Sequence, residues 1–242
     1  MQTKLLIYMK KIIAVLVVSI ALLACSSEKD GDMVVEGNIK GLKKGTLYLQ
    51  KMNDTAVVSV DSVAVFGDGN FKLTDNVISP EMYYLTFKGN TADKRILFFG
   101  NKGTITINDN IETFGFDTEV IGSENQLVFN KFTKINDQFK NQRLQFIKKE
   151  FDAVKSKNLD SIEKVKTDFN RMIRRKYLFT TNFALTNSDS EAAPYIALTE
   201  LYDANIKLLD TVNKSLSVHV KNSTYGKRLD QYITKVKNRE NK

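Results

Sequence analysis

Short apolar runs separated by polar turns fill the chain between Met33 and about Val120. The runs are rich in Val, Ile, Tyr, Phe and Thr, and this composition over such short lengths is typical of β-strands. The pattern predicts strands at residues 33–35, 46–49, 57–65, 71–73, 82–87, 96–99 and 104–107.

Glycine-rich turns lie between several of these runs. Gly67-Asp68-Gly69-Asn70 precedes the fourth predicted strand, and Gly100-Asn101-Lys102-Gly103 precedes the seventh. Such sequences supply the positive φ angles of tight hairpin turns. Asp68-Gly69-Asn70 also resembles the start of a calcium loop, but the later ligands and the closing glutamate are absent, which favours a turn. Seven or eight strands joined in this way predict an antiparallel β-sandwich or open barrel over residues 33–122.

Beyond Gly122 the apolar residues recur at threes and fours, which is the period of an amphipathic helix. Two long helices are predicted, and their apolar side chains are expected to pack as a core rather than to bind a ligand. The first helix carries Val128, Phe132, Ile135, Phe139, Phe146, Phe151 and Val154, and the second carries Ile162, Val165, Phe169, Met172, Phe179 and Phe183.

Capping signals and shorter periodic segments complete the helical half. Asp160, three residues before Glu163, is a candidate N-cap of the second long helix, and Ser188 with Glu191 is a candidate cap of a third. Pro194 belongs near the start of that third helix. With shorter helices at about 194–203, 206–220 and 225–236, residues 123–242 form a predicted α-helical domain, and the fold class is α+β.

The first 24 residues have the layout of a signal peptide. Basic residues come first, and residues 12–24 then form an uninterrupted run of apolar and small side chains. As a helix this run covers only about 20 Å, which is short for a transmembrane span.

The end of this run resembles the lipobox of bacterial lipoproteins. Leu22-Leu23-Ala24-Cys25 has the layout in which the thiol receives a diacylglycerol and the chain is cut before the cysteine. Bulky Leu22 disfavours ordinary signal cleavage at the same place. We therefore expect Cys25 to become an acylated N-terminus, with palmitate-type chains that hold the protein at the outer membrane.

The polar residues 25–32 are predicted to form a flexible tether. Their three acidic residues resemble the export signal of Bacteroidota surface lipoproteins, although Lys29 and Gly31 interrupt them. Exposure at the cell surface and exposure to the periplasm both remain open.

The amino-acid composition disfavours several kinds of catalytic and metal-binding site. The 242 residues include 36 basic and 28 acidic side chains, for a net charge of +8, with one cysteine, one histidine and no tryptophan. A single thiol forms no intramolecular disulfide or C-x-x-C pair, and a single histidine disfavours the usual zinc sites. The expectation is therefore no catalytic residue, no metal and no cofactor, and motifs of hydrolases, metalloproteases and nucleotide-binding loops are also missing.

The sandwich region carries recurring glycines, strands and an Asp-Ser pair between Val34 and Phe87. The segments are Gly37-Asn38-Ile39-Lys40-Gly41, Leu47-Tyr48-Leu49, Val60-Asp61-Ser62-Val63, Gly69-Asn70-Phe71 and Pro80-Glu81-Met82-Tyr83. This pattern resembles the domain of unknown function 4369, which commonly precedes the thioredoxin module of Bacteroidota thiol-disulfide oxidoreductases of the TlpA type. Ser190–Leu198 and Ser223–Gly226 are similar to the helical region between the two modules.

The resemblance implies a fold and a compartment rather than an activity. In those relatives a thioredoxin domain with a C-x-x-C pair follows, whereas this sequence stops at Lys242 and has no such pair. Thiol-disulfide exchange needs an attacking and a resolving cysteine. The resemblance therefore does not predict oxidoreductase activity for this chain.

Two groups of surface residues are candidate sites. Arg171, Arg174, Arg175 and Lys176 form a basic patch in the C-terminal half, which carries 23 basic and 14 acidic residues. The patch is either a solvated helix face or a contact with anionic lipid or glycan. His219 has no second histidine to pair with, so a structural or exposed role is expected. Short Asp-Ser/Thr-aliphatic patterns of the Bacteroidota O-glycosylation type place candidate sites at Thr55, Ser62, Ser161 and Thr211.

Taken together, these features predict a lipid-anchored cell-envelope protein that acts without catalysis as a binding or scaffolding module. One alternative is an accessory to an envelope thiol-disulfide system through a separate thioredoxin-like partner. Another is a surface lipoprotein that binds glycans or responds to envelope stress. Nucleic acid is not an expected partner.

Overall fold

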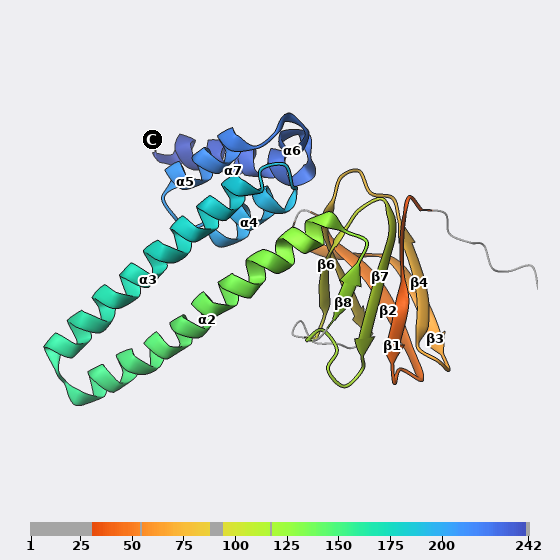
Figure 1. Ribbon diagram of the computed structural model, residues 1–242, viewed down its shortest axis with the longest axis horizontal. Coiled ribbons are helices and arrows are strands. Elements are labelled where there is room, and N and C mark those ends of the chain that lie inside the picture. Colours follow the sequence, from red (N-terminus) through yellow and green to blue (C-terminus); the bar gives the residue numbers. More distant parts are fainter. Residues whose placement is uncertain (1–30, 54, 88–93, 117, 241–242) are drawn as a thin grey trace, which may run out of the picture. The chain divides into compact units, whose positions relative to one another are not determined.

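Two four-stranded sheets and a set of helices make up the computed structural model, which describes residues 31–53, 55–87, 94–116 and 118–240 (Figure 1). In this part of the chain the strands are β1 (Met33–Lys40), β2 (Lys44–Asn53), β3 (Ala56–Phe66), β4 (Asn70–Asp75), β5 (Glu81–Phe87), β6 (Ile96–Gly100), β7 (Gly103–Asn110) and β8 (Glu119–Ile121).

The sheets have the strand orders β4-β1-β7-β8 and β3-β2-β5-β6. Neighbouring strands are antiparallel except β1 and β7, which run parallel, with Val35 opposite Ile105. The predicted sandwich and each of its seven strands are confirmed. The parallel pair and the short strand β8 are additions, because both depend on pairing between distant segments.

The core of the sandwich follows from alternation along the strands. Side chains at every second position point between the sheets, and water is excluded from Val35, Leu73 and Ile105 of one sheet and from Leu47, Leu85 and Phe98 of the other. The next residue of β6, Phe99, points to the outer face of its sheet. It is also fully buried, because helices cover that face at this point.

The C-terminal part is helical from residue 124 onward. Its helices are α2 (Glu124–Ser156), α3 (Leu159–Thr186), α4 (Ala192–Glu200), α5 (Ile206–Ser215), α6 (Val218–Asn222) and α7 (Thr224–Glu240). The two long helices α2 and α3 run side by side as a hairpin (Figure 1). The shorter helices pack around a second apolar core that includes Ala197, Leu209, Val212 and Leu229.

The helix ends differ from two of the expected caps. Lys157 ends α2 in the left-handed conformation, with φ 54°, and Asn158 then caps α3 by accepting a hydrogen bond from the Ser161 amide. Asp160 instead lies in the first turn of α3, where its charge favours the helix N-terminus. At α4 the N-cap residue is Glu191, without a side-chain cap, so the proposed Ser188 cap is wrong, whereas Pro194 does lie in the first turn.

Asp32–Lys242 form one compact unit. Among the described residues, no helix combines the length and the apolar character needed to cross a bilayer.

Candidate functional site

The predicted lipid-attachment site lies outside the described residues. Leu22, Leu23, Ala24 and Cys25 all fall in residues 1–30, so acylation stays a prediction. Asp32, the last residue of the predicted tether, is fixed to the sandwich: its carboxylate accepts the Val77 amide at 2.7 Å and pairs with Lys102 Nζ at 2.9 Å. These two interactions hold the pKa of Asp32 below its usual value.

A charged cluster closes the same end of the sandwich. Lys51 Nζ lies 2.7 Å from Asp75 and 3.3 Å from Glu81, and the Tyr83 hydroxyl donates to Asp75 at 2.7 Å. Burial alone would lower the pKa of Lys51, but the hydrogen bond to Asp75 and the charge of Glu81 outweigh it and raise the pKa. Burial raises the pKa of Tyr83, and the bond to Asp75 adds to this shift. The amine and the phenol therefore keep their protons at neutral pH, and the cluster is suited to joining β2, β4 and β5.

The sandwich is joined to the helices through an aromatic cluster. Phe99 of β6 makes edge-to-face contacts with Phe129 of α2, Tyr195 of α4 and Tyr225 of α7, with ring centroids 5.5 to 6.3 Å apart. Burial raises the pKa of Tyr195 to about 12. Contacts from three helices to one strand fix the helical region on the outer face of β6.

Two buried hydrogen bonds strengthen this junction. The Phe99 amide donates to Gln126 Oε1 of α2 at 2.8 Å, and the Met82 amide donates to the Tyr225 hydroxyl at 3.0 Å. Phe99 belongs to the edge strand β6 and Met82 to its neighbour β5, so the helices supply hydrogen-bond acceptors for two backbone amides of this sheet.

The single histidine joins a polar network at the start of α4. His219 Nε2 lies 2.8 Å from Glu191 Oε1, and Glu191 Oε2 accepts a hydrogen bond from Asn125 at 2.9 Å. The Glu191 side chain is buried, while His219 is exposed. Because Asn125 also accepts hydrogen bonds from Ser190 and the Ala192 amide, the network fixes the start of α2 to the start of α4.

The predicted basic patch is only partly assembled on α3. Arg171, Arg174 and Arg175 are exposed, and Arg171 lies 3.3 Å from Asp168. Lys176 is half-buried and pairs with Glu200 of α4 at 2.7 Å, so its charge joins two helices. The exposed part of the patch therefore consists of the three arginines.

The four candidate glycosylation residues lie in different surroundings. Thr55 is exposed in the turn between β2 and β3, and Ser62 is exposed on β3. Ser161 is half-buried in the first turn of α3, where its amide bonds to the cap. The Thr211 hydroxyl is exposed on α5 and donates to the Lys207 carbonyl at 2.7 Å.

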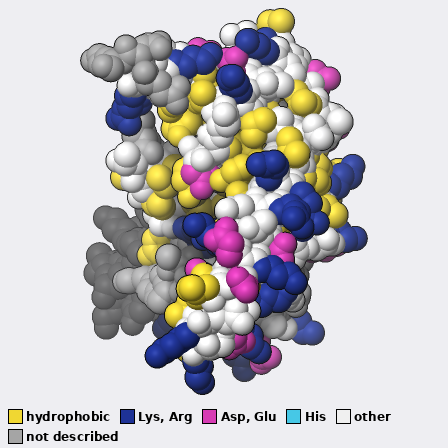
Figure 2. All heavy atoms as spheres, turned by 90° about the vertical axis from the view of Figure 1, so that its left-hand side faces the viewer, with side chains coloured by type: hydrophobic (Ala, Val, Ile, Leu, Met, Phe, Trp, Pro, Cys, Tyr) yellow, Lys and Arg dark blue, Asp and Glu magenta, His cyan; other side chains and the backbone are white. Residues whose placement is uncertain are grey.

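A row of exposed apolar side chains lies on the C-terminal half of α2. The exposed fractions are 65% for Leu144, 54% for Ile147, 67% for Phe151 and 57% for Val154. Figure 2 views the molecule from the side of the α2–α3 turn and shows hydrophobic side chains there among Lys and Arg. Four large apolar residues exposed along one helix form a contiguous apolar surface, and such surfaces mark interaction sites.

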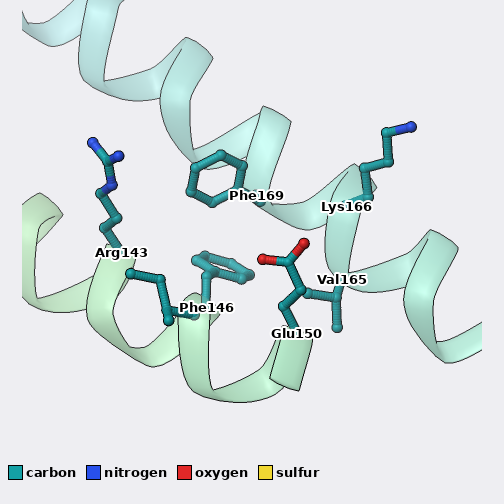
Figure 3. Close-up of a pocket in the computed structure, with 7 residues that line it drawn as sticks. Arg143, Phe146, Glu150, Val165, Lys166 and Phe169 are labelled. Atoms are coloured by element: carbon teal, nitrogen blue, oxygen red, sulfur yellow. The ribbon is translucent and has the colours of Figure 1, made fainter. Parts of the chain in front are cut away.

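A small cavity lies beside this row, between α2 and α3 (Figure 3). It measures about 230 Å³, and Ile147 belongs both to its lining and to the exposed row. Phe146 of α2 and Phe169 of α3 meet edge to face, with centroids 5.9 Å apart. Arg143, Glu150 and Lys166 also line the cavity, and the Glu150 carboxylate points toward the Phe146 ring (Figure 3).

This surface corrects the sequence interpretation. Phe132, Phe139 and Phe146 face α3 as expected, but Phe151 and Val154 were assigned to the same core stripe and are instead largely exposed. Leu144 and Ile147 were missed altogether. The available signal was their 3-4-3 spacing with Phe151 and Val154, which defines a second apolar line on the helix.

Comparison with protein families adds one finding. Residues 33–129 match the family model of the domain of unknown function DUF4369. The chain carries a DUF4369 domain. No curated protein and no solved structure matched the chain.

The DUF4369 match covers the sandwich and continues into the first turns of α2. Gln126, which accepts the Phe99 amide, lies in that extension. The Asp-Ser pair of the DUF4369 domain also has a structural role, because the buried Asp61 carboxylate accepts the Ser62 amide at 2.7 Å and the Thr74 amide at 2.9 Å. Asp61 thereby links β3 of one sheet to β4 of the other, next to the irregular pairing of β2 and β3.

In the described part of the chain, no cluster of three or more His, Cys, Asp or Glu side chains is arranged to hold a metal ion. The exposed row Leu144, Ile147, Phe151 and Val154 on α2 is the best-supported candidate site.

Proposed function

We propose that this protein is a lipid-anchored module of the cell envelope that binds another envelope component, without catalysis, through the C-terminal half of α2. The observation that carries the proposal is the exposed row Leu144, Ile147, Phe151 and Val154. Contact of this apolar surface with water is unfavourable in free energy. A partner that covers the row removes this area from water.

The attachment of α2 to the sandwich supports a binding role. Gln126 and Phe129, near the start of α2, are fixed to β6, while the exposed row lies some fifteen or more residues further along the helix. At 1.5 Å per residue this distance is roughly 25 to 40 Å. The DUF4369 domain therefore acts as a base that holds the binding face in a defined position.

The lipobox supports the membrane anchor. Leu22-Leu23-Ala24-Cys25 and the short apolar run before it favour acylation of Cys25, and two or more acyl chains give stable anchoring.

The anchor predicts a specific N-terminal peptide. We expect mass spectrometry of protein purified from its native membrane to show Cys25 as the first residue, carrying a diacylglycerol. In Cys25→Ser the leader should remain and the acyl mass should be lost. An unmodified Cys25, or a wild-type chain that keeps residues 1–24, would contradict the anchor.

The binding face predicts site-specific crosslinking in cells. A photoreactive phenylalanine analogue at position 151 should give a discrete crosslinked product in the intact envelope. The same analogue at position 66 is the matched control, because Phe66 is also exposed, at 68%, but lies on β3. We expect the product at position 151 to exceed that at position 66 by about tenfold or more if the row is a specific interface.

Equal crosslinking at positions 151 and 66, or none at 151, would contradict the binding role of α2. Turnover of a defined substrate by the purified protein would contradict the non-catalytic assignment. Recovery of a thioredoxin-fold protein at position 151 would favour the accessory role in thiol-disulfide exchange.

A further inference from the structure

The apolar row on α2 has the geometry of a helix-packing seam. Leu144, Ile147, Phe151 and Val154 follow a 3-4-3 spacing, which places apolar residues at the a and d positions of a heptad. At 100° per residue the four Cα directions span only about 80° of the helix circumference. A helix that lies in a membrane interface needs a broader apolar face, so the narrow row favours contact with another helix.

The charges beside the row indicate what kind of helix fits. Lys148 and Lys155 occupy one flank, and Arg143 and Glu150 occupy the other, all of them exposed. Three of the four flanking charges are therefore positive. Flanking charges of this kind set partner choice in helix pairs, and the pattern calls for acidic residues on the partner.

A second copy of the chain does not supply that complement. In an antiparallel pair of rows, Lys148 of one copy would face Lys148 and Lys155 of the other, and the two Glu150 side chains would meet. Attraction between Arg143 and Glu150 would offset only part of this repulsion. In a parallel pair, attraction between Glu150 and Lys155 would be opposed by repulsion between Arg143 and Lys148. Like charges in direct opposition disfavour the pairing.

We propose that the row Leu144, Ile147, Phe151 and Val154 binds an acidic amphipathic helix of a protein partner, which packs against α2 with its apolar seam. This inference rests on the binding role proposed above and specifies the class of partner. The Phe151 side chain is the largest apolar group in the row and is expected to be its main anchor.

The test uses the full chain in nanodiscs of zwitterionic lipid and two fluorescent synthetic helices. Both peptides have about four heptads with leucine at a and d, and they differ only in carrying Glu or Lys at the flanking e and g positions. We expect fluorescence anisotropy to give at least about tenfold tighter binding of the Glu peptide, with a difference that shrinks as salt is added.

Substitutions in α2 test the contributions of the apolar row and of the flanking charges separately. Phe151→Ser should weaken binding of the Glu peptide by about tenfold or more, because the main anchor is lost, whereas Phe66→Ser should leave it unchanged. The double variant Lys148→Glu with Lys155→Glu should reverse the preference toward the Lys peptide. All these side chains are exposed, so circular dichroism should show an unchanged fold.

Several results would overturn the inference. Equal binding of the two peptides, or no binding of either, would remove the acidic helix as the partner class. A wild-type oligomer that Phe151→Ser dissociates would assign the row to a second copy. Burial of a fluorescent probe at position 151 in nanodiscs of anionic lipid, without any peptide, would assign the row to the membrane surface. Crosslinking at position 151 in cells together with any of these results would leave the proposed function intact and reject only the partner class.

Discussion

Gly37→Ala is expected to lower the free energy of unfolding by about 3 kcal/mol or more, which would leave little folded protein. Gly37 lies in β1, between β4 and β7, and a Cβ at this position would overlap the carbonyl oxygen of Ile107. The obstacle is backbone of a central strand pair, so no side-chain rotation relieves it. Denaturant unfolding followed by circular dichroism, with the soluble yield, measures the effect.

Gly103→Ala is the matched control. Gly103 also has a positive φ, 101°, and begins the paired strand β7, but a Cβ there meets nothing within 4 Å. Only the conformational cost of the left-handed region applies, which is about 1 kcal/mol. Equal losses in the two variants would show that the close approach of β1 to β7 is not what requires glycine at position 37.

The parts of the fold that the sequence predicted depend on local signals. Strands such as β5 and β7 have β-branched and aromatic residues in short alternating runs, and the periodicity of α2 and α3 extends over many turns. Both signals arise from burial of one face and are visible in a single segment.

The parts that were missed depend on contacts between distant segments. β8 has only three residues, and its strand character comes from pairing with β7. The parallel register of β1 and β7 joins residues about seventy positions apart, as in the pair Val35 and Ile105. The end of α2 at Lys157 has no glycine to mark it, and the spacing of Asp160 and Glu163 predicts a cap two residues beyond the true cap, Asn158.

The candidate site was only partly predictable for the same reason. The charge of Lys176 is visible in the sequence, but its pairing with Glu200 depends on how α4 packs on α3. Phe151 continues the apolar period of α2, yet the sequence does not show that α3 packs along only one side of that helix. An apolar residue at helical spacing is therefore assigned to the core by default, and the exposed row is recognised only when both helices are in place.

Phe99→Ala is expected to lower the free energy of unfolding by about 3 to 5 kcal/mol and to loosen the helical region from the sandwich. The ring is fully buried and meets Phe129, Tyr195 and Tyr225, so its removal leaves a cavity where three helices meet β6. Hydrogen exchange read by mass spectrometry should show the largest loss of protection in α4 and the start of α7.

Phe98→Ala is the control, because the neighbouring ring is equally buried but points between the sheets and stacks on Tyr83. A similar loss of stability is expected, with the greatest increase in exchange in β2 and β5 of the sandwich. If both variants increased exchange in the same segments, sandwich and helices would open as one cooperative unit, and Phe99 would have no separate role at the junction. Different patterns would show that this one aromatic side chain couples the DUF4369 domain to the hairpin, and hence that crosslinking at Phe151 should weaken when Phe99 is lost.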